Sequence, residues 1–237
     1  MSATFAARLL ARIHRRFQTT TQTLLIGELR IPFTRITNPD VVLDQVAAEE
    51  DRREKQSGQR HEGDELHLPY WAELWESGLG IGQMLVASPQ LARDKNVLDL
   101  GCGMGLAGTV AAALGGNVLF ADLEADSLLF AALNSLPWRA NVRTRRLNWQ
   151  KDRLDERFDL ILGADILYEK IQWPFLEPFW RNHLAPGGSV LLGEPGRQTG
   201  DLFLEWIRQK PWKLELSEQP VITRPRPIRL FQLSPNR

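Results

Sequence analysis

An apolar run that ends in an acid and then breaks into alternate glycines constrains this chain more than any other feature. Residues 97–105 read Val-Leu-Asp-Leu-Gly-Cys-Gly-Met-Gly. A side chain at Gly101, Gly103 or Gly105 would keep a ligand from lying directly on the backbone at the carboxyl end of a strand. The pattern therefore predicts a buried strand, a tight turn and a nucleotide-like ligand above the turn.

A helix and a second strand complete this unit. Residues 106–114 are apolar and rich in alanine, so a helix there would point its free N–H groups toward an anionic part of the ligand. Residues 117–122 are mostly apolar and end in Asp122, which can accept hydrogen bonds from both ribose hydroxyls of an adenosine. The segments together predict a βαβ unit in which Asp122 and Leu123 contact the nucleoside.

The glycines alone leave two cofactor classes open. Gly103, Gly105 and Gly108 match the G-x-G-x-x-G spacing of dinucleotide-binding proteins, with an acid about 20 residues further on. Asp99 completes a second pattern, D-x-G-x-G-x-G, in which the acid steadies the loop and lies close to the amino-acid part of the cofactor. This second pattern resembles that of the seven-stranded S-adenosylmethionine-dependent methyltransferases.

Later segments strengthen the resemblance, which covers residue 71 to about residue 195. Residues 158–165 are similar to the fourth strand of these enzymes, and residues 184–192 are similar to the turn and strand after their fourth helix. The resemblance implies an α/β fold with a Rossmann-like seven-stranded sheet, mostly parallel with an antiparallel closing strand, and helices on both faces.

The element pattern agrees with that fold. Residues 73–86 are expected to form a helix. Strands are expected near residues 97–100, 118–122, 144–147, 160–164, 190–193, 214–217 and 228–233. A proline-rich stretch separates the last two strands, which suggests a closing antiparallel hairpin.

The first part of the chain is expected to be an accessory segment. Residues 1–68 would form this segment, with a helix, one or more strands and a charged loop. Residues 69–237 would form the methyltransferase domain. Residues 49–65 are charged and lack apolar periodicity, which predicts a solvated loop.

The amino terminus has two interpretations. Residues 1–17 contain four arginines and no acid. Their apolar residues at helical spacing are Leu9, Leu10, Ile13 and Phe17. The pattern fits a mitochondrial transit peptide, or an accessory helix that docks by its apolar stripe with the arginines outward. We favour the docked helix, because residues 24–33 continue into a strand without a cleavage-like break.

Composition narrows the partners and the compartment. Lys+Arg and Asp+Glu both number 29, so no global field draws the chain toward nucleic acid or acidic lipid. Cys102 is the only cysteine, which excludes an internal disulfide and suits a reducing compartment. No apolar run approaches the ~18 residues of a membrane span. We expect a cytoplasmic monomer, or a protein of the mitochondrial matrix if residues 1–20 are a transit peptide.

Neither the histidines nor the cysteine predicts a metal or thiol site. His14, His61, His67 and His183 lack metal-ligand spacing, and the single thiol offers no second soft ligand. We interpret Cys102 as a small residue tolerated where the backbone approaches the cofactor, since no basic group lies near it in sequence.

Three tryptophans are candidates for the cofactor pocket. Trp71 and Trp75 stand four residues apart, which would place them on one helix face; Trp71 is equally consistent with the hydrophobic core. Trp75 resembles the tryptophan that borders the cofactor in lysine-modifying protein methyltransferases, where an aromatic face can lie against a sulfonium cation. Trp149, after the third expected strand, is placed to flank adenine.

The end of the fourth expected strand narrows the reaction. Ala164 is expected to contact the cofactor, and the next four residues read Asp165-Ile-Leu-Tyr168. Nucleic-acid amino-methyltransferases usually have two prolines at the middle positions, which argues against base methylation here. D-x-x-Y instead resembles the signature of protein-lysine methyltransferases, which implies that Asp165 faces the incoming amine and Tyr168 shapes its channel.

A second motif follows the fifth expected strand. Gly193-Glu-Pro-Gly-Arg197 resembles the branch that contains the electron-transfer-flavoprotein β-subunit lysine methyltransferases, once described as nicotinamide methyltransferase-like. Glu194 stands where Asp is commoner, and the resemblance implies that it helps Asp165 to hold the amine. Arg197 is expected to meet an acidic surface of the partner through a bidentate pair.

These resemblances imply an S-adenosylmethionine-dependent N-methyltransferase that methylates lysine in a protein partner, with no nucleic acid and no membrane as partner. A small-molecule N-methyltransferase of the nicotinamide type is the main alternative. An RNA methyltransferase and a cofactor-binding protein without activity are weaker ones.

Overall fold

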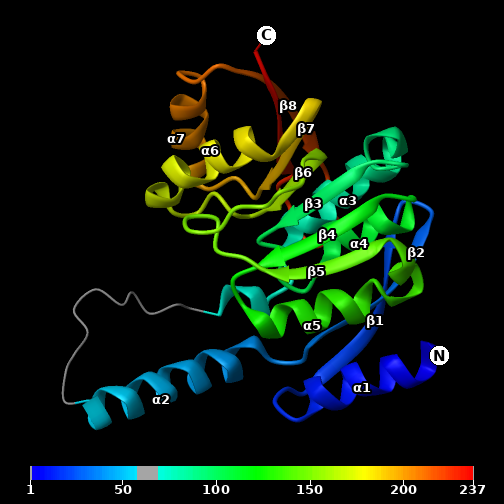
Figure 1. Ribbon diagram of the computed structural model, residues 1–237, viewed down its shortest axis with the longest axis vertical. Coiled ribbons are helices and arrows are strands. Elements are labelled where there is room, and N and C mark those ends of the chain that lie inside the picture. Colours follow the sequence, from blue (N-terminus) through cyan, green and yellow to red (C-terminus); the bar gives the residue numbers. More distant parts are fainter. Residues whose placement is uncertain (1, 58–68, 237) are drawn as a thin grey trace.

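The computed structural model of the protein describes residues 2–57 and 69–236, and a seven-stranded sheet forms its centre (Figure 1). The strands of this sheet are β3 (Asn96–Leu100), β4 (Asn117–Asp122), β5 (Val142–Arg146), β6 (Phe158–Ala164), β7 (Leu184–Glu194), β8 (Trp212–Gln219) and β9 (Ile228–Pro235). Their order across the sheet is β5-β4-β3-β6-β7-β9-β8, and β9 runs antiparallel to both of its neighbours. The predicted sheet with an antiparallel closing strand is confirmed.

Helices cover both faces because the strands are apolar on both sides. In β3, Val97 joins one buried cluster, whereas Leu98 and Leu100 join another, as alternation along a strand requires. The first cluster packs against α3 (Glu76–Ala87), α4 (Leu106–Ala113) and α5 (Ala125–Asn134). The second packs against α6 (Trp173–His183) and α7 (Gln198–Ile207).

All seven expected strands are present, and most extend further than predicted. The helix expected over residues 73–86 begins at Glu76, because Trp75 has an extended backbone at its N-cap and a short 3₁₀ helix at Tyr70–Ala72 precedes it. Trp71 and Trp75 therefore do not share a helix face, and that expectation was wrong.

The amino-terminal part contains a second helix that was not expected. It comprises α1 (Ser2–His14), β1 (Thr19–Ile26), β2 (Leu29–Ile36) and α2 (Pro39–Ser57). The single strand predicted over residues 24–33 is wrong: the chain reverses at Gly27, whose φ of +57° suits glycine, and forms a hairpin. The loop predicted over residues 49–65 is helical as far as residue 57, and its remainder lies outside the described residues.

α1 and the hairpin lie against α5 (Figure 1). Leu9, Ile13 and Phe17 are buried, while the four arginines of this segment are exposed. Asn134 at the end of α5 accepts a hydrogen bond from the Thr34 N–H at 2.8 Å and donates to the Thr34 carbonyl at 3.0 Å. The hairpin is thus fixed to the helix that supports the cofactor-side strands. None of the helices within residues 2–57 and 69–236 is long and apolar enough to cross a membrane.

Candidate functional site

A cavity of about 670 Å³ lies at the carboxyl ends of β3, β4 and β6. The predicted cofactor-binding residues all line it, and they are Trp75, Asp99, Gly101, Cys102, Gly103, Gly105, Asp122, Leu123, Trp149 and Ala164. Asp165 and Tyr168 line it too, whereas Glu194 does not. Parallel strands bring their carboxyl ends to one edge of a sheet, so residues as far apart in sequence as Trp75 and Tyr168 meet in a volume typical of small-molecule sites.

The glycine loop forms the floor of this cavity. Gly101, Gly103 and Gly105 have φ angles of +64°, +50° and +83°, which side chains rarely allow. A Cβ atom at Gly105 would also lie 2.7 Å from the Cβ of Ala131 on α5. The glycines therefore serve the turn and the packing of α5, besides leaving the backbone open to a ligand.

Asp99 steadies this loop from the end of β3. Its Oδ2 accepts a hydrogen bond of 2.8 Å from the Gly108 N–H in the first turn of α4. Its Oδ1 is buried and has no hydrogen-bond partner within the described chain. Burial raises the pKa of Asp99 to about 7, although the bond from Gly108 lowers it. One buried oxygen of a cavity-lining carboxylate thus remains available to a ligand.

Asp122 ends β4 and joins two backbone segments. Its Oδ2 accepts a hydrogen bond from the Gly103 N–H at 2.8 Å, and its Oδ1 accepts one from the Glu124 N–H at 2.9 Å. Burial raises its pKa to about 6, against the two hydrogen bonds. Each carboxylate oxygen retains a lone pair, so the side chain can also accept hydrogen bonds from two neighbouring hydroxyls.

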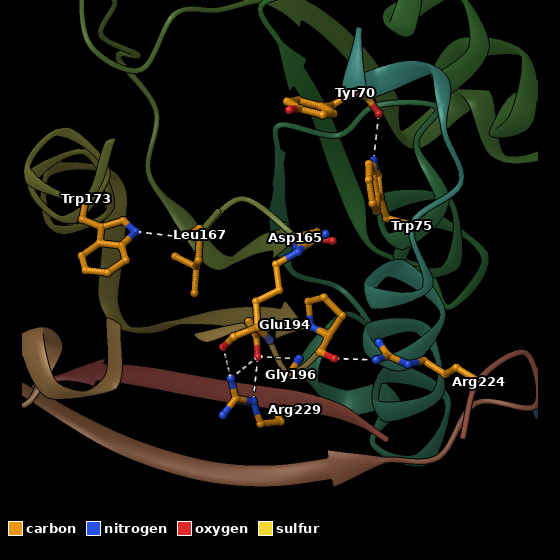
Figure 2. Close-up of polar contacts among 11 residues, drawn as sticks. Tyr70, Trp75, Asp165, Leu167, Trp173, Glu194, Gly196, Arg224 and Arg229 are labelled. Carbon is orange, nitrogen blue, oxygen red and sulfur yellow. Dashed lines mark hydrogen bonds and ion pairs between the residues drawn. The ribbon is translucent and has the colours of Figure 1, made fainter. Parts of the chain in front are cut away.

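Aromatic side chains form the walls. The indole N–H of Trp75 donates to the Tyr70 carbonyl at 2.8 Å (Figure 2). The Tyr70 ring lies edge-on to that of Tyr168, with centroids 5.3 Å apart. Trp149 is held by a 3.1 Å hydrogen bond from its indole N–H to Gln172. These fixed rings leave flat surfaces toward the cavity.

Trp71 serves the core and the cavity at once. Its ring contacts those of Phe17 and Phe130 at centroid distances of 5.5 and 6.0 Å, and the residue also lines the cavity. The accessory segment therefore supports one wall of the site through Phe17.

Asp165 follows β6 in an unusual backbone conformation. Its φ is +59°, and its N–H donates to the Gly193 carbonyl at 2.9 Å. Its Oδ1 pairs with the Arg197 guanidinium, while its Oδ2 is buried without a hydrogen-bond partner in the described residues. Burial raises the pKa of Asp165, and the pair with Arg197 opposes that rise. A strained, partly satisfied carboxylate at a cavity wall is typical of a functional residue.

Glu194 lies behind this wall rather than in it. Its carboxylate accepts hydrogen bonds from the N–H groups of Gly196 and Arg197 and pairs with Arg229 on β9 (Figure 2). Four donors surround the two oxygens, so the group is satisfied internally. The structure therefore favours a positioning role over the predicted contact with an amine.

The structure gives Arg197 a contact that the sequence analysis did not predict. Its guanidinium pairs with Asp165 of the same chain and lies 5.4 Å from the ring centroid of Trp75. The guanidinium is thus engaged within the chain, while the side chain remains 37% exposed. The motif over residues 193–197 drew attention to Arg197. No sequence pattern predicts its pair with Asp165, because the two residues are 32 positions apart.

Neither the thiol nor the buried histidine behaves as a reactive group. Burial raises the pKa of the Cys102 thiol well above its usual range. His183 accepts a hydrogen bond of 3.0 Å from the Leu154 N–H and contacts the Phe179 carbonyl, so it is a satisfied core residue. Within the described ranges, no group of three or more His, Cys, Asp or Glu side chains could hold a metal ion.

Solved structures share this fold. A glycopeptide N-methyltransferase, MtfA, solved with S-adenosyl-L-methionine, superposes with a TM-score of 0.56 at 14% identity, covering 66% of this chain and 87% of that one. A ribosomal protein L11 methylase from Lactobacillus delbrueckii subsp. bulgaricus gives a TM-score of 0.53 at 23% identity, covering 68% of this chain and 77% of that one.

Curated relatives are closer in sequence. The electron transfer flavoprotein beta subunit lysine methyltransferase of Rattus norvegicus is 34% identical over 136 residues, or 54% of this chain and 51% of that protein. The protein N-lysine methyltransferase METTL21A of Xenopus tropicalis is 35% identical over 51% of this chain and 58% of its own length. The EEF1A lysine methyltransferase 3 of Mus musculus is 27% identical over 62% of this chain and 66% of its own length.

The matches thus span about half to two thirds of the relatives' lengths. The model of a family described as lysine methyltransferase matches residues 67–210, well over half of the chain, and this protein therefore belongs to that lysine methyltransferase family.

Proposed function

We propose that the protein transfers a methyl group from S-adenosylmethionine to the ε-amine of a lysine in a protein partner. The observation that carries the proposal is the position of Asp165. Its buried Oδ2 is free of hydrogen bonds from the described residues, in a side chain that lines the same cavity as the glycine loop. Family membership supports the same activity.

The cavity residues fit the cofactor. Asp122 would hold the ribose hydroxyls, the buried free oxygen of Asp99 would face a hydrogen-bond donor of the amino-acid part, and Trp149 would flank adenine. When bound, S-adenosylmethionine supplies a methyl group on a positively charged sulfur. The Gly101–Gly105 backbone leaves room for it at the end of β3.

Residues of this chain would align the acceptor lysine and favour the neutral form of its amine. A lysine with an ordinary pKa near 10.4 must lose a proton before its nitrogen can attack, and an apolar channel favours the neutral amine. Asp165 Oδ2 would accept a hydrogen bond from that amine, and water would carry the proton away. Most of the acceleration would come from alignment.

Tyr168 would shape the channel without acting as a base. Burial raises its pKa to about 12, so its phenol stays neutral throughout the working pH range. Its ring packs against that of Tyr70, and both rings are partly exposed beside Ile171, which is 65% exposed. Exposed apolar side chains around a cavity mouth suit a protein surface better than a small metabolite.

We also propose a monomeric, cytoplasmic enzyme without nucleic acid as partner. The balanced charge supports the absence of a nucleic-acid partner, and the single cysteine supports a reducing compartment. The mitochondrial matrix is the alternative compartment.

The test is methylation of a lysate with labelled S-adenosylmethionine, followed by mass spectrometric location of the mark. We expect methyl-lysine in a protein with the unchanged enzyme and none with Asp165→Asn. Asn tolerates the positive φ of this position, so this variant removes the charge without adding backbone strain.

Calorimetry provides the control for that variant. Its affinity for S-adenosylhomocysteine should stay within a few fold of the unchanged protein, because the nucleoside contacts lie on β3 and β4. Label that remains in RNA after protease treatment, label in a small metabolite, or binding of NAD in place of S-adenosylhomocysteine would contradict the proposal. Full turnover by Asp165→Asn would remove Asp165 from the reaction.

A further inference from the structure

We propose that Arg197 is a positioning residue for the methyl acceptor: it holds one oxygen of Asp165 so that the other oxygen faces the lysine amine. The inference deepens the proposed function and rests on it, because it concerns the same carboxylate.

Two contacts fix the guanidinium. Its Nη1 pairs with Asp165 Oδ1, and its central carbon lies 5.4 Å from the ring centroid of Trp75, within cation–π range. Asp165 and Trp75 line the cavity, and Arg197 reaches them from the turn between β7 and α7. The guanidinium therefore supports two wall residues and leaves the cavity itself to the ligands.

The backbone of Arg197 is held equally firmly. Its N–H donates to Glu194, and its carbonyl accepts a 3.1 Å hydrogen bond from Arg229, which also pairs with Glu194 and Asp201. Arg224 adds a hydrogen bond to the carbonyl of Pro195 (Figure 2). This network connects β7, β9 and the start of α7, and it explains why Glu194 is buried beside the site.

The arrangement offers a single acceptor oxygen. Asp165 Oδ1 is taken by Arg197, whereas Oδ2 is buried and free of partners among the described residues. A carboxylate with both oxygens available can accept two parallel hydrogen bonds from the guanidinium of an arginine. A carboxylate with one available oxygen suits a single N–H of a lysine amine. The pair therefore favours lysine over arginine as the acceptor.

The charge of Arg197 also matters, because Asp165 must stay ionised. Burial raises the pKa of Asp165, and Arg197 is the main group that lowers it. The other groups that face it are Glu194, which raises the pKa, Arg224, which lowers it, and the neutral phenol of Tyr168. Without Arg197, Asp165 would become protonated at higher pH than it does now.

The experiment compares Arg197→Met, which keeps a long side chain against Trp75 without charge, with Arg197→Lys, which keeps the charge. Arg208→Met, an exposed arginine at the end of α7, is the matched control. Each activity is divided by that of the unchanged enzyme at pH 6, 7 and 8, which cancels the titration of the lysine. Calorimetry with S-adenosylhomocysteine and thermal unfolding check the pocket and the fold.

We expect Arg197→Met to lose roughly 10–100-fold in kcat/KM, as a lost charged hydrogen bond implies. The loss should grow as the pH falls, whereas Arg197→Lys should recover much of the activity and show a flat ratio. Binding of S-adenosylhomocysteine should stay within a few fold. Equal losses in both variants with flat ratios, or higher activity in Arg197→Met, would overturn the inference.

A second readout is independent of activity. Carbon-13 NMR of labelled aspartate, with the Asp165 signal assigned by its absence in Asp165→Asn, should give a higher pKa for Asp165 in Arg197→Met than in the unchanged protein. An unchanged pKa would overturn the inference even if the lysate assay detects methyl-lysine. If that assay detects none while the pKa rises, the pairing stands and the proposed function fails.

Discussion

At the scale of single residues, Asp99 offers a free carboxylate oxygen to the cavity, but burial of its charged form lowers the stability of the folded protein near neutral pH. Its carboxylate is 1% exposed, and burial raises its pKa from 3.8 to about 7. The folded protein binds this proton more tightly than the unfolded chain does. The stability associated with it is therefore complete below about pH 4 and is lost as the pH rises toward about 7.

Asp99→Asn tests this conclusion. The increase in pKa corresponds to at most about 4 kcal/mol, so we expect the variant to gain roughly 2–4 kcal/mol relative to the unchanged protein between pH 4 and pH 8. Urea unfolding at both pH values measures the difference. Asp94→Asn is the control, because it makes the same chemical change at an exposed aspartate. A difference of the same size in the control, or none in Asp99→Asn, would contradict the prediction.

At the scale of elements, Asn134 connects the accessory hairpin to the glycine loop. It is 2% exposed and forms three hydrogen bonds, two with the backbone of Thr34 and one of 2.9 Å from its amide to the Met104 carbonyl. Met104 lies between two glycines of the loop. One side chain at the end of α5 thus sets the position of β2 and of the cavity floor together.

We expect Asn134→Ala to lower the free energy of unfolding by about 2–3 kcal/mol, because it leaves buried backbone groups without partners. The affinity for S-adenosylhomocysteine should also fall, since the Met104 carbonyl in the glycine loop loses its hydrogen bond from Asn134. Chemical denaturation and calorimetry measure the two effects. The exposed Asn141→Ala should stay within about 0.5 kcal/mol on both measures. If Asn134→Ala left the affinity unchanged, the prediction would be wrong, because the hydrogen bonds of Asn134 would then not affect the site.

The sequence analysis located the central strands because these are buried along almost their whole length. β3, β4 and β6 are buried on both faces and read as apolar runs. α2 was missed because apolar periodicity reports a buried face and not helicity; its charged residues are good helix formers, and Asn38 caps its start. The hairpin was read as one strand because Gly27 and Glu28 make a turn too short to interrupt the apolar pattern.

At the scale of the whole molecule, the cavity was predictable because the fold brings strand ends together by rule. The motifs therefore marked Asp99, Asp122 and Asp165 in advance. What could not be predicted are contacts between motifs: the Arg197 pair with Asp165, the position of Glu194 behind it, and the Tyr70 ring against Tyr168. Such contacts depend on three-dimensional distances that no local pattern encodes.

The same scale shows that the accessory segment is part of the site. Phe17 packs against Trp71, which lines the cavity, and Phe33 of β2 is a lining residue itself. Most of this segment lies outside the region that the family model matches. Side chains of the accessory segment therefore pack against the region that the family model matches. Loosening α1 should disturb the cofactor pocket and not only the amino terminus.

Ile13→Asp tests this coupling, since Ile13 of α1 is fully buried and Arg12 beside it is exposed. Loss of the apolar burial and introduction of a buried charge should destabilise the protein by about 3 kcal/mol, or undock α1 at a lower cost. In either case Phe17 loosens from Trp71, so affinity for S-adenosylhomocysteine should fall several fold. Arg12→Asp makes the same chemical change at the outer face and should leave both the urea midpoint and the affinity close to those of the unchanged protein. Equal effects of the two substitutions would mean that charge on α1, and not its packing, acts on the site.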